Sequence, residues 1–171
     1  MFKISLVSLL FITYFVNAEE TRHANAHVHG LNNLTMVISQ NQIAVIYEMP
    51  IIQMLEEHEE HEEHEEHEEL TVSDESLAAF QNYSQLFAFP KGADCELVSF
   101  EHSLHNASTE GGHKDIELSY EFSCNQPSQL KSIAITAFDH FSELETLNFE
   151  AVINNKAIAK SLKSSDTKIM F

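Results

Sequence analysis

Short apolar runs separated by polar turns predict a β-rich fold. The first two runs, 34–38 and 43–49, are rich in β-branched residues, with Ser-Gln-Asn-Gln between them and Pro50 after the second. This arrangement predicts a β-hairpin. Later apolar runs are separated by Gly-Gly, Asn-Gln-Pro and Asn-Asn turns, and short strands at such spacing favour an antiparallel β-sandwich. We predict these strands from residue 95 onward and at 116–122, 130–137, 147–153 and 157–162.

Between residues 73 and 87 the apolar positions follow a different spacing. The apolar residues recur at spacings of three and four after Ser73-Asp74-Glu75, at Leu77, Phe80, Tyr83, Leu86 and Phe87. This predicts an amphipathic helix with a capped N-terminus, which the Pro90 region ends. A second helical turn is predicted at 138–144. The fold class is therefore mainly β, an antiparallel β-sandwich with one or two short helices.

The N-terminus predicts export. Lys3 precedes an apolar run at 4–16, and Val16-Asn17-Ala18 resembles a small-residue cleavage site, as in a secretory signal peptide at 1–18. Residues 19–171 are then one domain of ordinary size. No second run of about 18 apolar residues follows. We therefore expect a periplasmic protein without stable membrane insertion.

Residues 56–69 form the most unusual segment of the chain, because ten glutamates alternate there with four histidines at three-residue spacing. Imidazole nitrogen and carboxylate oxygen are ligands of Zn²⁺, and histidine is a neutral ligand near physiological pH. The pattern predicts metal capture, with Zn²⁺ as the favoured ion. The alternative is a solvated acidic run, which would need only glutamate. The histidines are His58, His61, His64 and His67.

Repulsion between the glutamates opposes helix formation in this tract. Glutamates three and four residues apart destabilise a helix, so the sequence predicts a disordered insertion that metal binding would order. The tract also supplies more than half of the net charge of −18. So acidic a chain is a poor partner for nucleic acid or anionic membrane.

Several histidines outside the tract are candidate ligands. His27 and His29 would share one side of a strand, with His23 close before them. His113 follows a Gly-Gly loop. His140 lies between Phe138 and Phe141, so core packing is its alternative. Weaker candidates are His102 and His105, which lie three residues apart.

The two cysteines, Cys95 and Cys124, are an even pair in a chain predicted to be exported. A disulfide that closes a loop of about thirty residues is therefore favoured over a metal-binding pair. Catalytic motifs are missing as well: the tract reads His-Glu-Glu-His and not His-Glu-x-x-His, and there is no Gly-x-Ser-x-Gly elbow or phosphate loop. We do not expect an enzyme.

Four segments carry a resemblance to a known family. They are Ala26-His27-Val28-His29-Gly30, Leu86-Phe87-Ala88-Phe89-Pro90, Ala93-Asp94-Cys95 and Tyr120-Glu121-Phe122-Ser123-Cys124. With them the chain resembles the ZrgA-type zinc-regulated periplasmic proteins, long catalogued as a domain of unknown function. The resemblance implies a soluble zinc-binding component, made under zinc limitation, that works with an ABC-type importer. It also implies a β-sandwich with a flexible His-rich insertion.

Two other functions stay open at this point. The first is a metal buffer or resistance protein for zinc, copper or nickel, because imidazole suits all three ions. The second is a non-catalytic interaction module in which the tract is a pH-sensitive linker. The favoured hypothesis is capture of Zn²⁺ in the periplasm for uptake.

Overall fold

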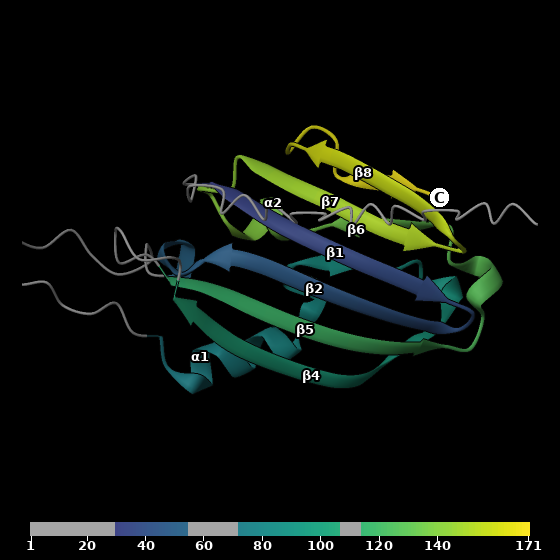
Figure 1. Cartoon of the computed structure of the whole chain (residues 1–171), viewed down its shortest axis with the longest axis horizontal. Helices are drawn as coiled ribbons and strands as arrows, with labels where there is room; N and C mark the ends of the chain where they lie inside the picture. Colours follow the sequence, from purple (N-terminus) through teal and green to yellow (C-terminus); the bar gives the residue numbers. More distant parts are fainter. Residues whose placement is uncertain (1–29, 55–71, 107–113) are drawn as a thin grey trace, which may run out of the picture.

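Two β-sheets make up most of the fold in the computed structural model (Figure 1), which describes residues 30–54, 72–106 and 114–171. The larger sheet has the strand order β4-β5-β2-β1-β7-β8, and the smaller one β3-β6-β9. The strands of the larger sheet are β1 (Leu31–Ser39), β2 (Gln42–Pro50), β4 (Cys95–Asn106), β5 (Lys114–Cys124), β7 (Thr146–Ile153) and β8 (Lys156–Leu162). The smaller sheet consists of β3 (Phe87–Ala88), β6 (Ser132–Ile135) and β9 (Lys168–Met170).

The smaller sheet and helix α1 (Asp74–Ala78) lie behind one face of the larger sheet (Figure 1). A second helix, α2 (Ala137–His140), links β6 to β7. The mainly β, sandwich-like fold with short helices that the sequence predicts is thus confirmed. The predicted disorder of the insertion concerns residues outside the described ranges. Short 3-10 turns complete the fold at Ile51–Met54, Ala79–Gln81, Tyr83–Gln85, Lys91–Ala93 and Pro127–Gln129.

The predicted hairpin is formed by β1 and β2. Ser39 pairs with Gln42 across a two-residue turn, in which Gln40 has a φ of 57°. Leu34, Met36 and the other inward positions of β1 are buried, whereas the residues between them are largely exposed. Period-two burial of this kind fixes the strand register, because a slip by one residue would expose the whole apolar set.

One strand pairing departs from the antiparallel arrangement expected from the sequence. β1 runs parallel to β7, from the pair Leu31–Thr146 to the pair Ile38–Ile153. The connection between these strands runs from residue 40 to residue 145 and includes most of the other elements. No local turn could therefore indicate the pairing. β1 therefore joins the N-terminal hairpin to the C-terminal hairpin of β7 and β8.

The helix predicted over 73–87 is much shorter in the structure. Its N-cap is confirmed, because Ser73 Oγ accepts the N–H of Ser76 at 3.1 Å. Beyond Ala78 the chain continues as separate 3-10 turns. The carbonyl of Phe80 accepts the Tyr120 hydroxyl at 2.8 Å, which provides that carbonyl with a partner from the sheet. Tertiary contacts with the sheet thus replace the regular helix that the apolar spacing predicts.

Aromatic side chains fill the space between the layers. Tyr83 packs edge-on against Phe122, with ring centroids 4.7 Å apart, and Phe87 packs in the same manner on Tyr120 at 5.5 Å. Phe122 and Tyr120 lie on β5, whereas the other two rings belong to the layer behind it. Edge-to-face pairs contribute about 0.5 to 1.5 kcal/mol each beyond their burial, so this cluster attaches the second layer to the middle of the large sheet.

A disulfide joins the start of β4 to the end of β5. Cys95 and Cys124 are register partners and are bonded to each other, as the sequence predicts. Just outside the bond, Asn125 Nδ2 donates to Asp94 Oδ2 at 3.0 Å, and the Asn125 N–H donates to the Asp94 carbonyl at 2.9 Å. Covalent and hydrogen bonds therefore hold these two strands together at one end of the sheet, here called the disulfide end.

Replacing both cysteines by serine should lower the free energy of unfolding by about 3 kcal/mol, because the bond restricts the unfolded chain. The urea midpoint of the oxidised protein and of the variant measures this loss. Dithiothreitol is the control: it should bring the parent protein to the midpoint of the variant and leave the variant unchanged. Equal midpoints without reductant would show that backbone pairing alone holds this end.

Candidate metal-binding end

The strand ends of the large sheet bring distant parts of the chain together. β1 and β7 begin at the end opposite the disulfide, and β2 and β4 finish there. Register places Pro50 beside Asp115, and Asn106 beside Lys114. We call this the entry end. It is defined by Gly30, Pro50, Asn106, Lys114 and Thr146.

Most of the predicted ligands lie outside the described residues, but the chain enters and leaves those segments at the entry end. Gly30 follows the segment with the three N-terminal histidines, and the 3-10 turn Ile51–Met54 precedes the acidic tract. The loop with His113 connects β4 to β5 at the same end. The ligands outside the described ranges are His23, His27, His29, His58, His61, His64, His67 and His113.

Gly30 is held tightly against the segment before β7. Its φ is 79°, a left-handed conformation that favours glycine. Its carbonyl accepts the N–H groups of Glu145 and Thr146, both at 2.9 Å. A Cβ at this position would lie 2.6 Å from the Glu143 carbonyl oxygen. Glycine after the His-x-His pair is therefore a packing requirement at the entry end.

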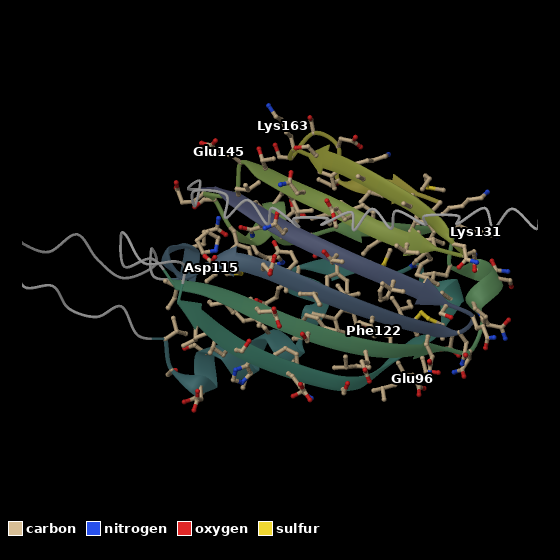
Figure 2. The ribbon with its side chains drawn as sticks, in the orientation of Figure 1. Glu96, Asp115, Phe122, Lys131, Glu145 and Lys163 are labelled. Atoms are coloured by element: carbon tan, nitrogen blue, oxygen red, sulfur yellow. A yellow bond between two sulfur atoms is a disulfide. The ribbon has the colours of Figure 1, made fainter. Side chains whose placement is uncertain are left out.

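Carboxylates also surround a recess at this end of the sheet. Glu48, Asp115 and Glu117 line a cavity of about 200 Å³ together with Ile116. Glu48 and Glu117 are register partners on β2 and β5. Figure 2 shows Asp115 at the end of the sheet away from Glu96. The recess offers oxygen donors, but the described ranges contain no group of three or more His, Cys, Asp or Glu side chains arranged to hold a metal ion.

Three of the candidate histidines belong to helices or strands of the described ranges. His140 ends α2 and is exposed, so the alternative of core packing is wrong for this residue. His102 is half-buried on β4, and its ring centroid lies 5.8 Å from that of Phe100. His105 pairs in register with Asp115 at the entry end. Within the described part of the chain, therefore, histidines approach this end on β4 and at α2.

Among the described residues, the side chains whose pKa is strongly shifted are two tyrosines of the core. Burial raises the pKa of Tyr47, whose hydroxyl oxygen accepts a hydrogen bond from Asn32 Nδ2 at 2.7 Å. Burial also raises the pKa of Tyr120, with a smaller contribution from Tyr47. Both phenols stay protonated at physiological pH, which suits hydrogen bonding in the core and not metal ligation.

A comparison with protein families identifies the family of this chain. The model of the ZrgA family, described as zinc uptake proteins, matches residues 26–171. The chain belongs to the ZrgA family. No curated protein matches it. The matched region begins at Ala26, so it includes His27, His29, the acidic tract and both cysteines.

Membership of the ZrgA family gives the chain a zinc-related role and places it in a family described by uptake and not by catalysis. The carboxylate oxygens of Glu48, Asp115 and Glu117 at the entry end are of a ligand type that zinc accepts. Across the described ranges, no helix is long and apolar enough to cross a membrane.

Sequence reasoning missed the carboxylates at the entry end. Glu48 and Glu117 lie in strands that were singled out only for their apolar positions, and their pairing depends on register. Glu143 and Glu145 precede β7, and the parallel pairing of β7 with β1 brings them beside Gly30. The one available signal was glycine directly after His-x-His, since an obligatory glycine marks close approach of another segment.

Replacing His140 by alanine should change the free energy of unfolding by less than about 0.5 kcal/mol, because the side chain is exposed. Thermal melting without metal measures this, and melting with added zinc then reports ligation directly. Ala137→Ser in the buried first turn of α2 is a matched comparison that should destabilise the protein. A large metal-free loss for His140→Ala would mean that the ring supports the fold.

Proposed function

We propose that this protein captures Zn²⁺ in the periplasm and assists high-affinity uptake by an ABC-type importer. The observation that supports the proposal is that the described strand ends flanking the His-bearing segments meet at the entry end, in a chain of the ZrgA family. The signal peptide at 1–18 would export the protein, and residues 19–171 would form its single domain.

Two kinds of binding follow from this arrangement. The segments with His27 and His29, with His113 and with His140 adjoin rigid strands or a helix, so their ligands can form a site of defined geometry. The tract at 56–69 offers many weak ligands on one chain, attached to the same end of the sheet. Weak ligands in high local concentration rebind a released ion. The tract would therefore raise the zinc concentration near the defined site.

The donor set supports delivery and not irreversible storage. Both cysteines are used in the disulfide, so thiolates contribute nothing to binding. Imidazole and carboxylate ligands bind zinc without the very tight closed coordination of structural thiolate sites. An importer could then withdraw the ion from such a site.

Calorimetric titration of the exported, EDTA-stripped protein with zinc should show one tight class of sites and a weaker class. A variant with the four tract histidines replaced by alanine should keep the tight class and lose most of the weak one. A matched variant with four tract glutamates replaced by glutamine should keep more of the weak class, because imidazole is the better zinc ligand. Absence of tight binding in the parent protein would overturn the proposal.

The role in uptake has a separate test in cells. Deleting the gene should slow uptake of radioactive zinc at limiting concentration, and only in cells that have an intact ABC-type zinc importer. Cells that lack the importer are the control. If deletion instead raised sensitivity to excess zinc and left uptake unchanged, the protein would be a metal buffer.

A further inference from the structure

The larger sheet has one face that no other described element covers. Helix α1 and the smaller sheet lie behind the larger sheet in Figure 1, on the side where its strands bury their apolar side chains. The residues between those buried positions point to the opposite side, because successive side chains of a strand alternate. We call this side the outer face. Its central positions are Thr35 and Val37 on β1, Ala44, Ile46 and Glu48 on β2, Glu117, Ser119 and Glu121 on β5, and Asn148, Glu150 and Val152 on β7.

Apolar side chains are exposed together on the outer face. Val37 is 45% exposed, Val152 44% and Ile46 39%. Val37 pairs in register with Val152 on one side and with Ala44 on the other. Ile46 follows Ala44 at the next outward position of β2. Neighbouring strands lie about 4.8 Å apart, so these four side chains form one apolar patch across three strands. Single exposed apolar residues are common on protein surfaces, whereas contiguous patches are a feature of interaction sites.

A carboxylate recess adjoins the apolar patch. Glu48, Asp115 and Glu117 line this cavity of about 200 Å³, and Glu48 is the next outward residue after Ile46 on β2. Glu48 and Glu117 are register partners, so their carboxylates come from adjacent strands. The described side chains form no group of three or more arranged to hold a metal ion. A planar guanidinium pairs with carboxylates through several N–H donors. The carboxylate recess therefore suits the side chain of an arginine.

The charges on the outer face have one sign. Carboxylates continue beyond the recess at Glu101 on β4, Glu121 on β5 and Glu150 on β7, and all three are exposed. Among the described side chains, no lysine or arginine occupies an outward position of the larger sheet. Lys131 and Lys163 lie at the margins of the molecule in Figure 2. The outer face therefore complements a cationic partner and repels the same face of a second copy.

We propose that the outer face docks a protein partner that presents an arginine beside apolar side chains. The guanidinium of the partner enters the carboxylate recess, and the neighbouring side chains of the partner cover the apolar patch. An apolar centre next to a charge-paired arginine is a frequent composition of the energetically important part of protein interfaces. This docking surface does not depend on zinc binding, because it uses none of the predicted histidine ligands.

The test uses a blocked peptide of sequence Val-Arg-Ile-Arg-Val as the probe and measures amide chemical shifts of the exported protein residue by residue. In every protein compared, the ten glutamates of the tract are replaced by glutamine, because they would otherwise attract the cationic peptide. The peptide should shift the amide signals of the outer face. A peptide of sequence Val-Glu-Ile-Glu-Val should leave those signals unchanged.

Two double variants separate the charge of the recess from the apolar contact. Glu48→Gln with Glu117→Gln should weaken peptide binding about tenfold, because the arginine loses charge-assisted hydrogen bonds. Val37→Thr with Val152→Thr keeps the shape of both exposed side chains and should weaken binding about fivefold, because less apolar surface is buried. The second variant tests the docking surface even if the first one is less stable.

The matched control is Glu75→Gln with Asp139→Asn, which removes the same charge from exposed positions on α1 and α2. This control should bind the peptide as the parent does, and urea midpoints show whether each variant is folded. The proposal is wrong if the peptide shifts no amide of the outer face, or if both test variants bind it as well as the control. It is also wrong if outer-face signals shift with protein concentration alone, because the face then contacts a second copy of this chain.

Discussion

Parallel pairing of β1 with β7 is the constraint on which the rest of this structure depends. Without it, no strand pairing would join the N-terminal hairpin to the C-terminal hairpin. With it, six strands form one sheet, and the first described residue, Gly30, lies beside the loop that leads into β7. A contact between the beginning and the end of the chain thus determines the geometry of the entry end.

Strand direction then explains why the described strand ends that flank the His-bearing segments lie at one end of the sheet. In antiparallel neighbours, the end of one strand lies beside the start of the next, so insertions between alternate strands fall on the same side. The start of β1, the end of β2, the end of β4 and the start of β5 therefore lie at one end of the sheet. The fold can therefore carry a long acidic insertion without interrupting its core, because that insertion begins where the sheet already ends.

The sequence predicted the parts of this protein that depend on neighbouring residues. The hairpin of β1 and β2, the Ser73 cap and the pairing of Cys95 with Cys124 all followed from local pattern or cysteine count. The helix after Ser73 was overestimated, because the Tyr120 hydroxyl takes the Phe80 carbonyl as its acceptor. The juxtaposition of Gly30 with Glu143 and Glu145 could not be foreseen, because it depends on a pairing between residues more than a hundred positions apart.

The position of the disulfide has a consequence for how the protein responds to its surroundings. Cys95 and Cys124 lie at the end of the sheet away from the entry end. A change in the oxidation state of this pair therefore acts on the end of the sheet opposite the carboxylates Glu48, Asp115 and Glu117. Reduction would remove the cross-link and release two thiols at the disulfide end, far along the sheet from those oxygen atoms. As long as the bond is intact, a soft metal ion finds neither sulfur atom available as a thiolate.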